Sequence, residues 1–212
     1  MVTTPAKPEI EDKAATPSHE LASPIKLRLP AEWDPTDEAL IELSRINEPW
    51  DFELTADREL VFVAPEGLGS SARGVRLIGQ VIRWSDAEGG GIVFGPQMGA
   101  RLADSSVKMP DVAWVSDERW SDRDVDEFAL LHGAPDLVIE IVSKSDSLAA
   151  QHEKMTEWMA NGVKLGWLID PFRDVVFICR PDTDPERLEH PDTLSGEDVC
   201  EGLEVSLERI WK

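Results

Sequence analysis

Residues 135–171 read PDLVIEIVSKSDSLAAQHEKMTEWMANGVKLGWLIDP, and this stretch contains the pattern that decides the fold. An apolar run from Leu137 to Val142 predicts a buried strand. Residues 147–160 carry apolar side chains at helical spacing, with Asp146 or Ser147 as the N-cap and Asn161-Gly162 as the end of the helix. VKLGWLID then predicts a second strand, so the stretch is a strand, a helix and a strand.

Glu140 places a carboxylate in the middle of the first of these strands, between Ile139 and Ile141. Apolar residues occupy both faces of the strand around it, so alternation does not bring it to solvent. Burying an unpaired charge costs several kcal/mol, on the order of the cost of breaking a buried ion pair. Glu140 therefore needs a partner, which can be a metal ion, a cationic side chain or a proton.

The length and composition predict one folded domain with a tail. A chain of 212 residues suffices for one full core and is short for two. Residues 1–29 contain four prolines and few large apolar residues, which predicts a disordered tail, with the domain at residues 30–212. No apolar run resembles a signal peptide or a membrane span, and the two cysteines fit a reducing compartment, so we expect a cytoplasmic protein with no membrane partner.

The net charge of −21 argues against a general affinity for nucleic acid. Lys and Arg supply most of the binding energy toward phosphates, and this chain as a whole repels DNA. The simplest interpretation is that the charge keeps the protein soluble. A role on DNA requires bound metal ions or a local basic surface, for which the candidates are Arg73, Arg76, Arg83, Arg101 and Lys108.

Upstream of the central stretch, the pattern predicts two helices and a hairpin. Residues 35–47 fit a short helix that buries Leu40, Leu43 and Ile46, with Asp34 as the N-cap candidate and Pro35 at the first helical position. Residues 49–64 fit two strands joined by a turn. Glu53 lies in the first of these strands, where alternation favours a position facing solvent. Residues 70–86 fit a longer helix, because Val75, Ile78, Ile82 and Ser85 fall at helical spacing and Leu77, Val81 and Trp84 widen this face.

Three residues around the central stretch suggest a metal site. Asp111 begins one predicted strand, Glu140 lies in the next, and Lys154 follows on the helix, where a helical wheel places it at the edge of the apolar face. Convergent carboxylates suit Mg²⁺, and a nearby lysine can stabilise charge that develops on a phosphate. Each residue also has an ordinary explanation, because Pro-Asp often marks a turn and lysines at a helix edge often extend into solvent.

In order along the chain, MPDVAWVSDERW, PDLVIEIVSKSD, QHEKMTEWMANGV and KLGWLIDP resemble the Uma2 family of restriction-endonuclease-like proteins. This family is part of the PD-(D/E)XK nuclease superfamily. The resemblance runs from about Leu40 to Trp211, and the ordered series of four blocks is more specific than any one of them. It implies an α/β fold in which helices flank a mixed central sheet that holds a divalent metal.

Position by position, the resemblance assigns Asp111 and Glu140 to the catalytic acidic pair and Glu53 to the acidic residue of the first block, with all three as metal ligands. Two residues after Glu140 the superfamily pattern has lysine, and this chain has Val142. In the resembled family the lysine lies on the following helix, which indicates Lys154. Lys144 is the competing candidate, at a position where the family usually has proline, and Gln151 on the same helix face can assist.

The resemblance implies a DNA endonuclease that depends on Mg²⁺, with Mn²⁺ as a possible substitute. Lys154 would act on the scissile phosphate or on the attacking water. A homodimer is plausible because a duplex has two strands to cut. Two alternatives stay open: a weak or inactive nuclease fold used for binding or regulation, and an α/β binding domain without a metal.

Overall fold

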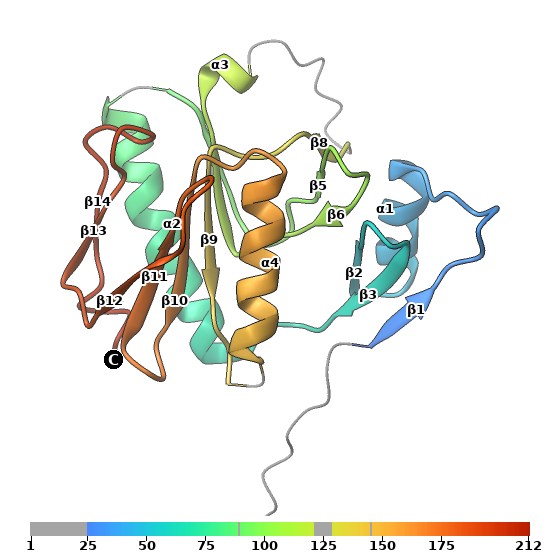
Figure 1. The fold of residues 1–212 in the computed structure, drawn as a ribbon, viewed down its shortest axis with the longest axis horizontal. Coiled ribbons are helices and arrows are strands. Elements are labelled where there is room, and N and C mark those ends of the chain that lie inside the picture. Colours follow the sequence, from blue (N-terminus) through green and yellow to red (C-terminus); the bar gives the residue numbers. More distant parts are fainter. Residues whose placement is uncertain (1–24, 89, 121–128, 145) are drawn as a thin grey trace, which may run out of the picture.

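The computed structural model describes residues 25–88, 90–120, 129–144 and 146–212 (Figure 1). Residues 1–24 of the predicted tail and residues 121–128 lie outside the described residues. Within the described ranges, two six-stranded sheets and one two-stranded sheet are connected by four helices. This confirms the predicted α/β fold in which helices flank a mixed sheet.

The sheet that contains Glu140 is mixed. Its order is β12-β11-β10-β9-β7-β4, and only the central β9–β10 pair is parallel. The two parallel strands read as near-continuous apolar runs because helices or neighbouring chain cover both of their faces. The strands are β4 Ile92–Phe94, β7 Val112–Val115, β9 Leu137–Ile141, β10 Leu165–Asp170, β11 Val175–Cys179 and β12 Glu186–Glu189.

A second sheet lies beside the first and has the order β1-β3-β2-β6-β5-β8. It includes the predicted hairpin, in which Glu53 pairs with Val61. Its strands are β1 Lys26–Arg28, β2 Asp51–Leu54, β3 Glu59–Val63, β5 Ala100–Arg101, β6 Val107–Lys108 and β8 Leu131–His132. The two-stranded sheet near the carboxyl terminus pairs β13 Thr193–Ser195 with β14 Glu204–Ser206.

Helix α4 (Leu148–Ala160) begins and ends at the signals expected from the sequence, whereas α1 (Asp37–Ile46) is capped by Thr36 and not by Asp34. The Ser147 hydroxyl accepts a hydrogen bond from the Ala150 N–H at 3.5 Å, and Gly162 takes a left-handed φ of 102° just after the last turn. None of the helices in the described ranges is long and apolar enough to cross a membrane. They are α1 Asp37–Ile46, α2 Leu68–Glu88, α3 Asp117–Trp120 and α4 Leu148–Ala160.

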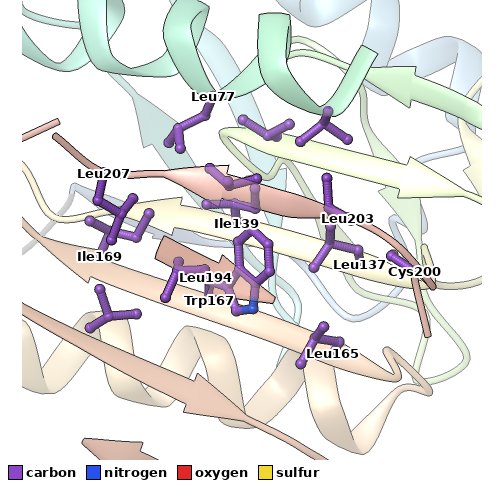
Figure 2. Close-up of a cluster of buried hydrophobic side chains, with 14 of the residues drawn as sticks. Leu77, Leu137, Ile139, Leu165, Trp167, Ile169, Leu194, Cys200, Leu203 and Leu207 are labelled. Atoms are coloured by element: carbon purple, nitrogen blue, oxygen red, sulfur yellow. The ribbon is translucent and has the colours of Figure 1, made fainter. Parts of the chain in front are cut away.

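Strand β9 presents its two faces to different helices, with α4 on the near face of the sheet in Figure 1 and α2 on the far face. The odd-numbered residues Leu137, Ile139 and Ile141 join a core cluster with Leu77 and Val81 of α2 (Figure 2). The even-numbered residues Val138 and Val142 join a second cluster with Met155 and Trp158 of α4. Glu140 has the same parity, so the alternation of the strand directs it toward α4.

The prediction of a tail through residue 29 is wrong for its last five residues. Strand β1 pairs antiparallel with β3, the Phe62 N–H donates to the Ile25 carbonyl at 3.0 Å, and Leu29 is buried. The interaction is made mainly by backbone groups at the edge of a sheet, and all three residues of β1 are exposed. Composition measures apolar content and therefore does not detect such a strand.

Two helix faces also differ from the prediction. Ile46 is exposed in the last turn of α1, although Leu40 is buried as expected. On α2, Leu77 and Val81 are fully buried, whereas Val75 and Ile82 point to solvent. This helix is apolar on two opposite faces, so its periodicity alone does not select the face that packs on the sheet.

Asp136, at the start of β9, holds together three segments of the fold. Its carboxylate accepts a hydrogen bond from the Ser116 N–H at 2.9 Å and pairs with Arg119 at 3.0 Å and Lys164 at 2.7 Å. Burial opposes the charged form, but the contacts with Lys164, Ser116 and Arg119 outweigh it and hold the pKa of Asp136 below its usual value. The carboxylate therefore stabilises the fold above about pH 4, and this contribution disappears as pH falls through the lowered pKa.

We expect Asp136→Asn to lower the free energy of unfolding by about 1–3 kcal/mol at pH 7, because a charged hydrogen-bond acceptor is lost. The difference from wild type should shrink as pH falls below about 4. Urea unfolding across this pH range measures both quantities. Asp174→Asn is the matched control, since Asp174 is about half exposed. Equal losses in the two variants would contradict the structural role of Asp136.

Candidate active site

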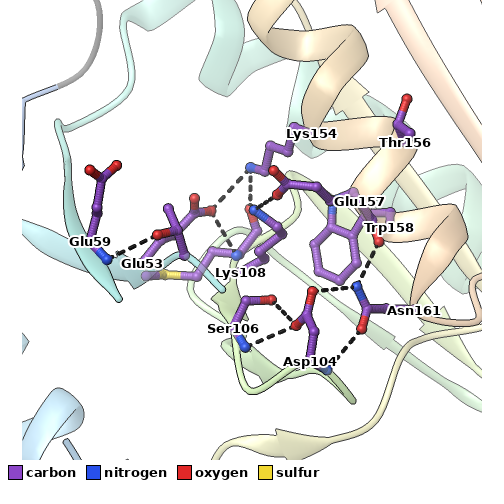
Figure 3. Close-up of polar contacts among 12 residues, drawn as sticks. Glu53, Glu59, Asp104, Ser106, Lys108, Lys154, Thr156, Glu157, Trp158 and Asn161 are labelled. Atoms are coloured by element: carbon purple, nitrogen blue, oxygen red, sulfur yellow. Dashed lines mark hydrogen bonds and ion pairs between the residues drawn. The ribbon is translucent and has the colours of Figure 1, made fainter. Parts of the chain in front are cut away.

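Four separate elements supply the predicted site residues. Glu53 lies on β2, Asp111 immediately precedes β7, Glu140 lies on β9, and Lys154 lies on α4. Figure 3 shows Lys154 extending from α4 toward Glu53. The structure thus joins residues that are as far apart in the sequence as 53 and 154.

The register of two antiparallel strands places Asp111 opposite Glu140. Val112 of β7 pairs with Ile139 of β9, so the preceding residue of β7 faces the following residue of β9. Residues opposite each other in an antiparallel pair have Cβ atoms about 5 Å apart. The Asp111 Oδ2 atom also accepts a hydrogen bond of 2.6 Å from the Ile141 N–H, which fixes the side chain against β9.

Lys154 connects the two sheets through its ammonium group. The Nζ atom lies 3.1 Å from Oε1 of Glu140 and 3.2 Å from Oε1 of Glu53, and it donates to the Met109 carbonyl at 2.7 Å. The side chain of Lys154 is 21 % exposed and that of Glu140 only 4 %. The partner that the sequence required for Glu140 is therefore a lysine.

Glu140 has a second donor that the sequence did not reveal. The indole Nε1–H of Trp158 donates to Oε1 of Glu140 at 2.8 Å, while the ring packs in the core. Trp158 follows Lys154 by four residues on α4, so both side chains lie on one face of the helix. That spacing next to a buried glutamate is a signal that sequence inspection can use.

Glu53 is buried, so its predicted solvent-facing position is wrong. It is 9 % exposed, and its Oε1 atom accepts a hydrogen bond from the Met109 N–H at 2.9 Å. Strand β2 is an inner strand, and the segment after β6 together with the Lys154 ammonium covers this face. Alternation identifies which residues share a face, but it does not show what covers that face.

Asp111, Glu140 and Lys154 each affect the pKa of the others. Burial, followed by the negative charge of Glu140, raises the pKa of Asp111 to about 8, and burial also raises the pKa of Glu140. Burial opposes the charged form of Lys154, yet Glu140, Glu53 and Asp111 together outweigh it and raise the pKa of Lys154. Lys154 is therefore a permanent cation at physiological pH.

The comparisons with known proteins identify the family of this chain and show that its fold is shared. The family model for Uma2, described as "Putative restriction endonuclease", matches residues 37–208. The chain belongs to the Uma2 family. No curated protein matches it.

A solved structure shares the fold of this Uma2 protein. It is a crystal structure of "a putative nuclease belonging to DUF820" from Anabaena variabilis, with a TM-score of 0.64 and 22 % sequence identity. The match covers 78 % of the present chain and 91 % of the Anabaena chain. Most of the domain therefore has the same architecture as that protein.

The other candidates for the site differ in their surroundings. Lys144 is exposed in the turn after β9, whereas Lys154 contacts two carboxylates. Val142, where the superfamily pattern has lysine, is a buried core residue. Gln151 lies one turn before Lys154, and its Oε1 atom is buried without a hydrogen-bond partner among the described residues.

The basic residues proposed for a DNA-facing groove are not gathered in one place. Arg73 and Arg76 on α2 donate to backbone carbonyls of Ile210 and Arg209 near the carboxyl terminus. Arg101 pairs with Asp37, and the buried Lys108 pairs with Glu157 of α4 (Figure 3). Lys108 thus helps to hold α4 against β6, next to the site.

The donor set suits a hard divalent cation. Asp111 and Glu140 supply carboxylate oxygens from neighbouring strands, and Mg²⁺ typically takes one or two protein carboxylates together with waters. Glu53, Asp111 and Glu140 face a single ammonium, that of Lys154, so their full ionisation leaves an excess of negative charge. Burial is the main cause of the raised pKa of Asp111, and the negative charge of Glu140 adds to it. A divalent ion at Asp111 and Glu140 would compensate that charge.

Glu53 contacts the lysine of the site, whereas Asp111 and Glu140 lie opposite each other on neighbouring strands. Among the described residues, no group of three His, Cys, Asp or Glu side chains is arranged as a ready metal cluster. The Lys154 ammonium contacts both Glu53 and Glu140. In this geometry the contacts of Glu53 orient the lysine.

Proposed function

We propose that this Uma2 protein is a divalent-metal-dependent DNA endonuclease that hydrolyses phosphodiester bonds, with Mg²⁺ as the ion and Mn²⁺ as a substitute. The observation that carries the proposal is the ammonium of Lys154 next to the buried Glu140, with Asp111 opposite on the neighbouring strand. An acidic pair beside a fixed cation suits the stabilisation of a phosphoryl group as it gains negative charge. Membership of a family described as restriction endonucleases supports the same reaction class.

Asp111 and Glu140 are the proposed metal ligands. When bound, the ion would supply Lewis acidity toward a phosphate oxygen and would lower the pKa of a water molecule. The Ile141 N–H holds Asp111, and Trp158 holds Glu140, so both carboxylates are oriented before substrate arrives. This preorganisation reduces the reorganisation needed during the reaction.

Lys154 is proposed as the electrostatic catalyst. Because its pKa is raised, it keeps its proton and does not serve as a general base in this geometry. Its Nζ–H groups can donate to an oxygen of the scissile phosphate or orient the attacking water. Glu53 and the Met109 carbonyl hold the ammonium in place, which makes them positioning groups.

The charge of −21 favours the alternative of a nuclease fold that binds or regulates without cutting. The dispersed arginines also favour this alternative, because they do not form a basic groove at the site. Cleavage and DNA binding therefore need separate measurements.

The test is cleavage of supercoiled plasmid by the purified protein in Mg²⁺, Mn²⁺ or EDTA. We expect nicking or linearisation in either metal, no cleavage in EDTA, and a loss of about 100-fold or more in Asp111→Ala and Glu140→Ala. Asp174→Asn is the control, as an exposed acid on the turn between β10 and β11. Equal cleavage by all four proteins would indicate a contaminating nuclease and remove the proposal. DNA binding in Ca²⁺ without cleavage in either active metal would support the binding alternative.

A further inference from the structure

Two ion pairs connect helix α4 to the second sheet, and only one of them belongs to the proposed catalytic site. Lys154 of α4 pairs with Glu53 of β2, and Glu157 of α4 pairs with Lys108 of β6 (Figure 3). The side chain of Lys108 is 6 % exposed and that of Glu157 is 48 % exposed. Burying an ammonium is costly even when it is paired, so a neutral side chain would be the simpler occupant of position 108.

The four residues of these pairs alternate in charge. The antiparallel register of β2 and β6 places Glu53 opposite Lys108 on one face of the sheet. On α4, Lys154 and Glu157 are three residues apart and share one face of the helix. Each charged residue of the sheet therefore meets a helix residue of the opposite charge. We call Glu53, Lys108, Lys154 and Glu157 the charge quartet.

The alternation of the charge quartet selects one position of α4 on the sheet. One helical turn rises about 5.4 Å, which is close to the spacing of about 4.8 Å between neighbouring strands. A slip of the helix by one turn in one direction would bring Lys154 to Lys108. A slip in the other direction would bring Glu157 to Glu53. Both slips set like charges against each other at a buried place, so the observed position is the one that pairs all four charges.

The backbone of the segment after β6 transmits this register to the site. Met109 directly follows Lys108, its N–H donates to Glu53 at 2.9 Å, and its carbonyl accepts from Lys154 at 2.7 Å. The Lys108 side chain thus ties to α4 the same piece of chain whose main-chain groups hold Lys154 and Glu53. A change in the contact at Lys108 would therefore move the groups that orient the Lys154 ammonium.

Polar contacts continue along the same face of α4 beyond the charge quartet. The Asn161 Nδ2–H donates to the Asp104 carboxylate at 2.9 Å, and the Asp104 N–H donates to Asn161 Oδ1 at 3.2 Å (Figure 3). Asn161 follows Glu157 by four residues, so both lie on one face of the helix. Hydrogen bonds and ion pairs fix a relative position more narrowly than apolar packing, which tolerates repacking.

We propose that the Lys108–Glu157 pair positions Lys154 for phosphodiester hydrolysis. The two residues are positioning residues that act through α4 and Met109 and do not touch the substrate. The inference rests on the proposed function, since it names two further residues on which the same reaction depends. A misplacement of about 1 Å can cost on the order of 100-fold in rate. Because Glu53 and Met109 still hold the ammonium, we expect a smaller loss, about 10-fold, when the pair is removed.

Plasmid cleavage in Mg²⁺ by Lys108→Met, Glu157→Gln and the double variant tests this role. We expect kcat to fall by about 10-fold in all three, with KM for DNA within about 2-fold of wild type. If Lys108 were instead a contact to DNA phosphate, its removal would raise KM and weaken the salt dependence. Removing the charge of Glu157 reduces the repulsion of DNA, so net charge does not explain a lower kcat in Glu157→Gln.

The double variant separates positioning from stability. Glu157→Gln alone leaves a buried ammonium unpaired, whereas the double variant has neither charge, so its urea midpoint should return close to that of wild type. Its kcat should stay low, because a neutral pair no longer selects the register. Lys164→Met is the matched control, since it removes a lysine paired with the buried Asp136 and should lose stability without losing kcat. A double variant that regains wild-type kcat together with wild-type stability would overturn the proposal.

Amide hydrogen exchange at Met109 tests the positioning without any activity. Its N–H donates to Glu53, so its exchange rate reports how well this segment stays in place. We expect about 10-fold faster exchange in the double variant, with unchanged exchange at Val138 in the core. A wild type that cleaves no DNA would remove the proposed function, and the exchange rates would still decide whether the pair positions this segment. Equal exchange at Met109 in wild type and the double variant would overturn the inference.

Discussion

Lys154→Met is expected to lower the free energy of unfolding by about 3–5 kcal/mol at pH 8, the cost typical of breaking a buried ion pair from one side. Methionine keeps most of the volume of the side chain but removes the ammonium that lies between Glu53 and Glu140. Both carboxylates then remain in a buried site without a counterion. Urea unfolding in EDTA measures the loss, and plasmid cleavage should fall by about 100-fold or more in the same variant.

The pH dependence separates this effect from simple loss of packing. Burial already raises the pKa of Glu140, and removal of the lysine raises it further. A raised carboxyl pKa means that the folded state takes up the proton more readily than the unfolded state, so the penalty shrinks as pH falls and grows as pH rises. A loss caused only by packing would be independent of pH.

Two further variants test the assignment of the penalty to uncompensated charge. Adding Glu53→Gln to Lys154→Met should restore part of the stability, because one of the two stranded carboxylates is neutralised. Lys164→Met is the matched control, since Lys164 pairs with Asp136 but is about half exposed. If Lys154→Met and Lys164→Met lost the same stability, the buried network around Lys154 would not have the strength inferred from its geometry.

The strand–helix–strand unit could be predicted from the sequence because its pattern is local. The apolar run around Glu140, the cap at Ser147 and the stop at Asn161-Gly162 each depend on neighbouring residues, and the structure confirms all of them. The need of Glu140 for a partner could also be predicted, because it follows from burial alone. The identity of that partner depends on which elements pack together.

Contacts between distant segments explain the features that the sequence did not show. Strand β1 exists because β3 has a free edge, and Glu53 is buried because Lys154 and Met109 reach it from other elements. Trp158 fitted the core on its periodicity, while its Nε1–H bond to Glu140 depends on how α4 lies across β9. Helix α2 has two apolar faces, and only the packed structure distinguishes the core face from the exposed one.

Asp111→Asn is expected to increase stability at pH 8 in the absence of metal and to abolish cleavage. Burial and the charge of Glu140 raise the pKa of Asp111 to about 8, while the unfolded chain has a value near 3.9. The folded state thus holds the proton more tightly, and wild type in EDTA should lose stability as pH rises from about 4 to about 8. Asparagine has no proton to lose and can still accept the hydrogen bond from the Ile141 N–H.

Without metal, Asp111→Asn should therefore equal wild type near pH 5 and exceed it in stability at pH 8, as measured by denaturant midpoints in EDTA. In Mg²⁺ the order should reverse or converge, because an ion that binds only the folded state adds RT ln(1 + [Mg²⁺]/Kd) to the stability of wild type. The asparagine variant, with one anionic ligand fewer, should gain much less. Its cleavage activity should be lost even where it is the more stable protein.

The prediction for Asp111→Asn has two parts, the gain in stability in EDTA and the smaller stabilisation by Mg²⁺, and one control variant tests both. Glu42→Gln removes an exposed acid on α1, so it should show neither the gain in EDTA nor the loss of response to Mg²⁺. If Asp111→Asn were more stable than wild type at pH 8 but Mg²⁺ did not stabilise wild type, ionised Asp111 would be destabilising and the proposed metal site would be wrong. A response to Mg²⁺ that is identical in wild type and Asp111→Asn would move the metal ligand elsewhere. Only the combined result ties the electrostatic strain of the carboxylate pair to the binding of a divalent ion at the same position.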